Sequence, residues 1–137
     1  NIVVANYAGI PGHVKVSDFV IVGGLAGIHQ FSRVGEGALI SGGAMCVQDI
    51  FPFSLSQGDR ATIRGLNIVG MKRRNFSKEA ITNVKKAYKI YFMSDLSHDE
   101  AQKEIKALYD ENPIRDLKVI CEFLENSERG LARTSKE

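Results

Sequence analysis

Three consecutive cations, Lys72-Arg73-Arg74, form the most concentrated group of chemically active side chains in this 137-residue sequence. They belong to a basic stretch, residues 60–94, that holds nine basic side chains and a single acidic one, Glu79. Cations directly before a helix are mildly unfavourable for the helix, which favours a purpose other than stability. Such a stretch can bind a phosphate or an acidic partner, and a solvated helix face is the alternative.

Three histidines are the candidates for proton transfer. A neutral imidazole near pH 7 can take the proton of an attacking hydroxyl group. His13 and His29 stand in the N-terminal half, where a surface histidine is the alternative, and His98 is expected to face solvent at a helix start without a role. Cys46 and Cys121 are far apart, which indicates neither a disulfide framework nor a metal site and fits a reducing cytoplasm.

The elements that must position these residues begin with a repeat of six. Apolar residues or cysteine recur at every sixth position: Val4, Ile10, Val16, Val22, Ile28, Val34, Ile40 and Cys46. Four positions after most of them stands a small or aliphatic residue: Ala8, Val14, Val20, Ala26, Ser32, Ala38 and Ala44. A helix has a period of 3.6 and a strand in an antiparallel sheet a period of two, so neither explains the repeat. One short strand and one corner per unit do explain it, and three units close a triangular coil of about 18 residues around an apolar column.

Glycines are expected at the corners of this coil, where positive φ or close backbone approach is needed. They are Gly9, Gly23, Gly24, Gly27, Gly35, Gly37, Gly42 and Gly43. The repeat is expected to stop at residues 50–53, where Pro52 suits a terminating turn. Because it is in full register from Val4 without a capping segment, we expect further coils before Asn1.

The second half of the sequence follows helical spacing. Ser77 is expected to cap a first helix, and Ser97 to open a second helix through a capping box. Asn112 and Pro113 offer the N-cap and first position of a third helix. The polar tail from Glu128 is expected to fray.

We therefore expect a parallel β-helix over residues 1–53, a connector over residues 54–75 and an α-helical bundle over residues 76–137. Hydrophobic residues make up 44% and charged residues 25% of the chain, which argues against a disordered protein. The 13 glycines show no period of three, which argues against a collagen-like protein. No apolar run approaches the roughly 20 residues of a membrane span, and no signal peptide is visible.

Four segments carry a resemblance to a known family. They are Pro11-Gly12-His13-Val14, Ile28-His29-Gln30-Phe31, Gln48-Asp49 and Asn67-Ile68-Val69-Gly70-Met71-Lys72-Arg73-Arg74-Asn75-Phe76-Ser77. Together with the six-residue period they resemble the UDP-N-acetylglucosamine O-acyltransferases, which catalyse the first step of lipid A synthesis. Many acyltransferases share the period, whereas the last string is much more specific. The resemblance covers essentially the whole chain but only about the C-terminal half of the family's length.

The resemblance implies a left-handed coil, an exception to the usual hand of parallel connections, and a homotrimer with its active sites between neighbouring subunits. It implies transfer of a 3-hydroxyacyl group from the phosphopantetheine thioester of acyl carrier protein to the 3-hydroxyl of UDP-N-acetylglucosamine, in the cytoplasm. It implies neither a metal nor a redox cofactor, and no nucleic-acid partner.

Residues near the reacting atoms follow from the same resemblance. The backbone N–H of Gly12 would face the oxyanion that develops on the thioester carbonyl, and His13 would support the reaction. The general base, a histidine, would lie upstream of Asn1. His29 and Gln30 would position the sugar, the diphosphate or the thioester.

Residues farther from the reacting atoms would bind the rest of the substrates. Asn67, Arg73 and Arg74 match positions that bind the nucleotide or the phosphopantetheine phosphate, and arginine suits phosphate oxygens because it can bind two of them at once. Gly42 matches the acyl-chain ruler. Because glycine leaves the groove open there, the sequence predicts a long acyl chain rather than a short one.

Two positions depart from the family pattern, and the lysines nearby extend the assignment to the carrier protein. Val69 stands where the family often has glutamate, which removes a hydrogen-bond acceptor, and Arg60 stands where it often has histidine. The surrounding lysines, Lys78, Lys85, Lys86 and Lys89, would steer the acidic carrier protein to the site.

Two other functions remain open from the sequence. One is a related N-acyltransferase that acts on another sugar nucleotide. The other is a non-catalytic trimeric β-helix that binds an acidic partner through its basic stretch.

Overall fold

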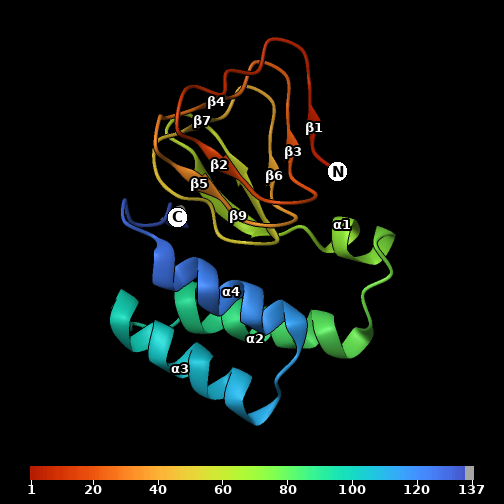
Figure 1. Ribbon diagram of the computed structural model, residues 1–137, viewed down its shortest axis with the longest axis vertical. Helices are drawn as coiled ribbons and strands as arrows, with labels where there is room; N and C mark the ends of the chain where they lie inside the picture. Colours follow the sequence, from red (N-terminus) through yellow and green to blue (C-terminus); the bar gives the residue numbers. More distant parts are fainter. Residues whose placement is uncertain (135–137) are drawn as a thin grey trace.

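The six-residue repeat folds into short strands separated by corners. The computed structural model of the protein describes residues 1–134, with a coil of strands followed by helices (Figure 1). The first seven strands have two residues each: β1 (Val3–Val4), β2 (Lys15–Val16), β3 (Ile21–Val22), β4 (Gly27–Ile28), β5 (Arg33–Val34), β6 (Leu39–Ile40) and β7 (Met45–Cys46).

Every pair among these seven strands is parallel and joins residues 18 apart. Val4 pairs with Val22 and Val22 with Ile40, and the pairs β2–β5 and β4–β7 have the same offset. The three sets of strands form the three faces of the coil. The predicted parallel coil is therefore confirmed. Its inner column is buried from Val22 onward, whereas Val4 and Ile10 are exposed at the N-terminal end.

The corners also recur every six residues, but glycine does not make most of them. Positive φ occurs at Tyr7, His13, Phe19, Leu25 and Phe31 and continues at Gly37 and Gly43. We call residues 7, 25 and 43 the first corner, residues 13 and 31 the second, and residues 19 and 37 the third. Among the predicted corner glycines, only the two named here have positive φ.

Close contact between successive coils explains other glycines. A Cβ on Gly23 would lie 2.4 Å from the backbone nitrogen of Gly42, and one on Gly35 would lie 2.5 Å from the nitrogen of Pro52. Both distances are shorter than any tolerated contact, so these residues allow the coils to stack.

The coil continues beyond residues 50–53, where the sequence predicted its end. Strand β8 (Ser54–Gln57) pairs in parallel with β6, and Ile40 faces Ser56, an offset of 16 instead of 18 residues. The repeat is thus shortened by two residues and not ended. The predicted connector then contains β9 (Thr62–Leu66), antiparallel to β8, and the short helix α1 (Ile68–Arg73).

Three longer helices follow: α2 (Lys78–Phe92), α3 (His98–Glu111) and α4 (Arg115–Asn126). Ser77 caps α2 and Ser97 forms the predicted capping box. The predicted start of the third helix was wrong. Asn112 is the C-cap of α3, so α4 begins only after Ile114. Among residues 1–134, no helix is both long and apolar enough to cross a membrane.

The helices pack on the last coil through a hydrophobic cluster that is distinct from the inner column of the coil. In α2, the buried residues Ile81, Val84, Ala87 and Tyr91 follow at intervals of three or four, so they line one face. This face packs with buried residues of α3 and α4 and with Phe51 and Phe53 of the last coil.

The C-terminal segment returns to the coil, where the sequence predicted a frayed tail. Leu131 is 2% exposed and bridges to Asp49, and Thr134 bridges to Ile63. The prediction is wrong from Glu128 to Thr134, because backbone pairing and burial of Leu131 fix this segment. Its last three residues lie outside the described part of the chain.

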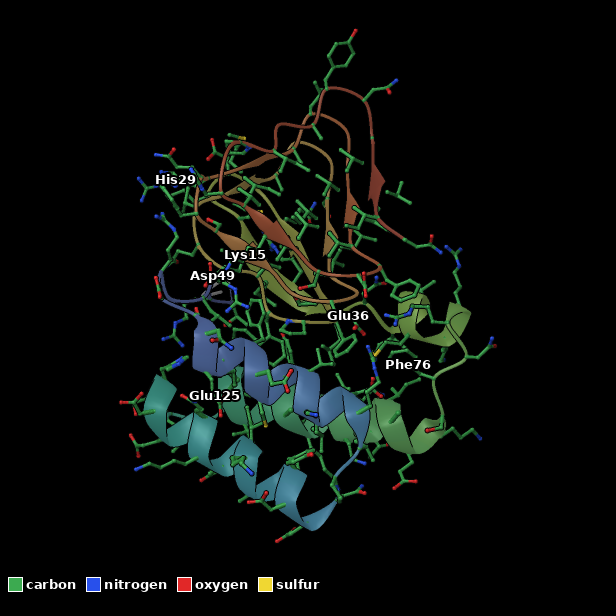
Figure 2. All side chains as sticks on the ribbon, viewed as in Figure 1. Lys15, His29, Glu36, Asp49, Phe76 and Glu125 are labelled. Carbon is green, nitrogen blue, oxygen red and sulfur yellow. The ribbon has the colours of Figure 1, made fainter. Side chains whose placement is uncertain are left out.

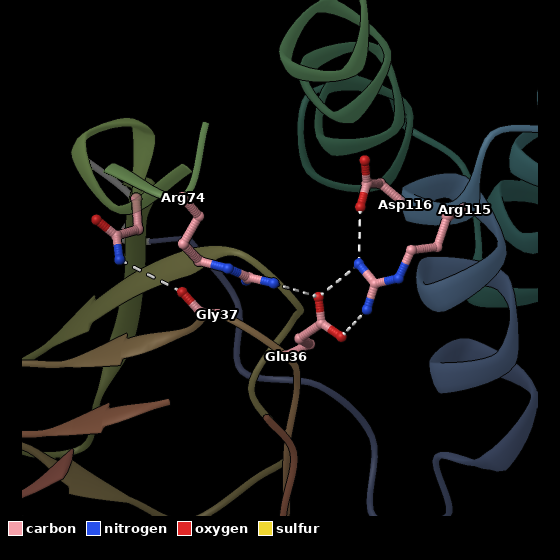
Figure 3. Close-up of polar contacts among 6 residues, drawn as sticks. Glu36, Gly37, Arg74, Arg115 and Asp116 are labelled. Carbon is pink, nitrogen blue, oxygen red and sulfur yellow. Dashed lines mark hydrogen bonds and ion pairs between the residues drawn. The ribbon is translucent and has the colours of Figure 1, made fainter. Parts of the chain in front are cut away.

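A buried carboxylate links the coil to the helices. Glu36 is 6% exposed and lies at the junction between the two parts (Figure 2). It accepts a hydrogen bond from Arg74 at 3.2 Å and pairs with both terminal nitrogens of Arg115 on α4 (Figure 3). Arg115 also donates to Asp116 at 3.1 Å.

Replacing Glu36 with alanine should lower the free energy of unfolding by about 1–3 kcal/mol, because the guanidinium groups of Arg74 and Arg115 lose their shared acceptor. Urea denaturation followed by circular dichroism measures the change. Asp110→Ala is the matched control, because Asp110 pairs with Lys106 on an exposed helix face and should have no measurable effect. Equal stability of the two variants would contradict the linking role of Glu36.

Candidate functional site

The second corner of the coil carries two of the predicted groups near the reacting atoms. Gly12 and His13 are exposed there, and the imidazole of His13 stacks on Phe31 with ring centroids 4.8 Å apart and planes at 7°. The stack fixes the plane of the imidazole. A Cβ on Gly12 would meet nothing within 4 Å, so packing within this chain does not require a glycine there.

His29 and Gln30 lie one coil further along the same side. The Nδ1 atom of His29 is 2.8 Å from the carbonyl oxygen of Gln30, and both residues are exposed. They line an open, mainly apolar hollow of about 640 Å³ along the face formed by β4 and β7, together with Pro11 and Met45. This hollow can accept an apolar chain beside two polar side chains.

Gly42 lies at the first corner, where packing accounts for part of its identity. A Cβ at this position would be 3.3 Å from the carbonyl oxygen of Gly24, a tight contact that requires a small shift of the neighbouring coil. Gly43, with φ at +73°, makes the corner itself. The role of Gly42 as a ruler is therefore compatible with the structure, which gives this glycine a packing reason as well.

Asn67, Arg73 and Arg74 gather at the third corner, on the side of the coil where α1 lies. They line a hollow of about 470 Å³ whose other walls are mostly apolar. The side chain of Asn67 accepts a hydrogen bond from the Gly70 backbone at 3.0 Å and donates to the Gly37 carbonyl at 3.3 Å. Asn67 thus caps α1 and attaches it to the coil.

The two arginines differ in how much of the guanidinium is available. Arg74 lies over the ring of Phe19 at 3.7 Å and over that of Phe76 at 4.9 Å, and it pairs with Glu36. Arg73 is exposed and has no ion pair among the described residues. Arg73 is therefore the guanidinium that can bind an outside phosphate without giving up an internal contact.

One chain does not bring the predicted residues together. Gly12, His13 and Gln30 lie at or beside the second corner, Gly42 at the first, and the group around Arg73 at the third. In Figure 2 His29 lies on one side of the coil and Phe76, next to α1, on the other. A site that combines the residues of the second and third corners needs the second corner of one copy against the third corner of another.

Sequence reasoning missed the residues that hold these groups in position. Phe19, Phe31 and Glu36 have no match in the predicted set, yet they fix Arg74 and His13. The signal was the phase of the repeat: His13, Phe19 and Phe31 all stand three residues after an inner-column position.

The remaining candidates serve structural purposes. His98 does not simply face solvent, because its Nδ1 atom lies 2.8 Å from the hydroxyl of Tyr91 and links α3 to α2. Burial raises the pKa of the Cys46 thiol to about 11, so this thiol is neutral at pH 7. Burial also raises the pKa of the Cys121 thiol. Within residues 1–134, no group of three or more histidine, cysteine or acidic side chains could hold a metal ion.

Comparison with known proteins gives a consistent result. The family described as Udp N-acetylglucosamine O-acyltransferase; Domain 2 matches residues 49–132. A protein of Campylobacter concisus named acyl-(acyl-carrier-protein)–UDP-N-acetylglucosamine O-acyltransferase is 42% identical over 132 residues, which are 96% of this chain and 48% of the relative. A relative of the same name from Burkholderia orbicola is 36% identical over 135 residues, 97% of this chain and 52% of its own length.

Solved structures agree with the sequence relatives. The crystal structure of UDP-N-acetylglucosamine O-acyltransferase from Moraxella catarrhalis matches with a TM-score of 0.91 and 35% identity, over 96% of this chain and 51% of that one. The acyltransferase of Francisella novicida matches with a TM-score of 0.93 and 31% identity, over 98% and 49%. The chain thus spans about half the length of the relatives it matches.

Replacing Arg74 with methionine should lower the free energy of unfolding by about 1–2 kcal/mol, because the ion pair with Glu36 and the contact with Phe19 are lost. Arg73→Met is the matched control and should leave stability unchanged, because Arg73 is exposed and unpaired among the described residues. Thermal unfolding of both variants measures the difference. A similar loss of stability in both variants, or in neither, would contradict the assignment of Arg74 to fold stability and of Arg73 to ligand binding.

Proposed function

The chain belongs to the UDP-N-acetylglucosamine O-acyltransferase family, and we propose that the protein containing it transfers a 3-hydroxyacyl group from acyl carrier protein to the 3-hydroxyl of UDP-N-acetylglucosamine, in lipid A synthesis. The observation that carries this proposal is the family match over residues 49–132, together with the exposed residues at the second and third corners. The coil is proposed to be left-handed, and the helices within residues 76–126 are proposed to form a bundle that acts as a domain.

The proposed reaction moves an acyl group from the sulfur of a thioester to the oxygen of a sugar hydroxyl. The sugar oxygen attacks the thioester carbonyl, the bond from that carbon to sulfur breaks, and the phosphopantetheine thiol leaves with a proton. The base that takes the hydroxyl proton is proposed to be a histidine upstream of Asn1. The N–H of Gly12 would donate to the oxyanion, and the space on the Cβ side of this glycine is open, since a Cβ built there would meet nothing within 4 Å.

The other residues are proposed to bind rather than react. His13, held flat against Phe31, would contact the sugar or the thioester, with His29 and Gln30 beside the apolar hollow that could take the acyl chain. Arg73 would bind a phosphate of the nucleotide or of phosphopantetheine. Arg74 and Asn67 would assist mainly by holding α1 against the coil.

The proposal requires a second copy beside each site, because the two groups of residues lie at different corners of the same chain, and the assembly is proposed to be a homotrimer. The partners would be acyl carrier protein and UDP-N-acetylglucosamine. Exposed lysines on α2, Lys85, Lys86 and Lys89, support a contact with the acidic carrier protein. The acyl group would arrive on phosphopantetheine, and no further cofactor is proposed. Buried, unpaired cysteines support a reducing compartment such as the cytoplasm.

Replacing Arg73 with alanine in the intact protein should raise the KM for the acyl donor or for the sugar nucleotide several-fold, because a charged phosphate contact is lost. Steady-state assays with each substrate varied in turn identify which one is affected. Lys103→Ala, on the exposed face of α3, is the control and should leave both values unchanged. An Arg73 variant with normal kinetics would remove this residue from the site, and an intact protein without acyltransferase activity would contradict the proposed function.

Replacing Gly42 with methionine should shorten the preferred acyl chain, because the side chain would enter the groove that glycine leaves open. Competition between acyl donors of different length measures the preference. Gly42→Ala separates this effect from the tight contact with Gly24, since it adds the Cβ without the long side chain. Unchanged selectivity in the methionine variant, or an equal change in the alanine variant, would contradict the ruler.

A further inference from the structure

A column of three residues crosses the hollow that His29 and Gln30 line. Strands β4 and β7 lie side by side in Figure 1, and Gly9, Gly27 and Met45 pair in succession on this face of the coil, each 18 residues after the one before. All three line the hollow. The two glycines bring no side chain to the face, so Met45 is the first member of the column that does.

The end of the Met45 side chain lies over the neighbouring coil. A Cβ built on Gly27 would be 2.9 Å from the Cε atom of Met45 and 3.1 Å from its Sδ atom, so the thioether fills the space that a side chain at residue 27 would need. Met45 is nevertheless 43% exposed, because the hollow lies open beside it. A methionine side chain has three rotatable bonds and a polarisable sulfur, so it can adapt to an apolar chain laid against it.

Met45 stands between the two ends of the path proposed for the acyl chain. His29 and Gln30 directly precede the second corner, whereas Gly42 lies at the first corner, before β7 begins. A chain that runs along this face from the reacting end toward Gly42 therefore passes Met45. Glycine at residue 42 leaves the far end open, but the thioether narrows the path before that end.

We infer that Met45 is a second residue that determines which acyl chains the protein accepts. The inference rests on the proposed acyltransferase function. No lysine, arginine, aspartate or glutamate of residues 1–134 lines the hollow, which suits a hydrocarbon tail. A tail that ends before the thioether does not contact it, whereas a longer tail must displace it from Gly27 or pass beside it. Because the thioether is adaptable, Met45 grades chains by length and does not exclude the longer ones outright.

Replacing Met45 with alanine in the intact protein should raise kcat/KM for the longer of two 3-hydroxyacyl donors, relative to the shorter, about three- to tenfold. Met45→Phe should lower the same ratio, because a ring cannot fold away as a thioether does. Competition between two donors that differ by a few carbons, followed by mass spectrometry of the products, measures the ratio.

Met93→Ala is the matched control, because Met93 is 70% exposed at the C-cap of α2, outside the hollow, and should leave the ratio unchanged. An unchanged ratio in Met45→Ala, or an equal change in the Met93 variant, would overturn the inference.

A binding measurement separates this inference from the proposed function. Intact protein labelled with ¹³C at its methionine methyl groups is titrated with 3-hydroxyacyl pantetheine, and the Met45 signal is assigned by its loss in Met45→Ala. The longer thioester should shift the Met45 signal and leave the Met93 signal in place. A Met45 signal that does not move overturns the inference, even where the protein transfers acyl groups. A protein without acyltransferase activity contradicts the proposed function, and the Met45 signal still decides whether an acyl tail reaches this residue.

Discussion

The backbone of the coil depends on one constraint: it must turn through positive φ once in every six residues. Five of the seven corners up to Gly43 carry side chains other than glycine, and each such residue costs about 1–3 kcal/mol. The stacking of successive coils offsets this cost by burying the inner column from Val22 onward. In return, each of these corners projects a large side chain outward, and the groups around His13 and Arg74 are built on three of them: His13, Phe19 and Phe31.

The six-residue period was sufficient to predict the parallel pairing, because every pair from Val4 to Cys46 keeps the same offset. It did not predict the last coil, since the chain loses two residues before Ile50 while backbone pairing continues with β8. The return of Leu131 to Asp49 was also hidden, because a seven-residue segment with one leucine looks polar in sequence. Both misses have the same cause: the contacts join residues that no local pattern relates.

The candidate site divides in a similar way. The motif around Asn67 and Arg74 was visible in the sequence, but the side chains of both residues form contacts within the chain that only the fold reveals. Glu36 could not be assigned from sequence, because its partners Arg74 and Arg115 are 38 and 79 residues away. Since Glu36 joins both arginines and Phe53 packs in the hydrophobic cluster of the helices, the helices hold α1 and its exposed Arg73 at a fixed position relative to the coil.

The returning C-terminal segment has a consequence for how this protein avoids end-to-end stacking with other copies. A coil ends in backbone N–H and C=O groups that have no neighbouring strand to pair with, and such an edge readily pairs with a strand of another molecule. Residues 130–134 occupy this edge, because Gly130 and Ala132 bond with Asp49 and Arg133 bonds with Ile63. A molecule in which this segment detaches would expose a growing end, open to stacking by another copy along the axis of the coil.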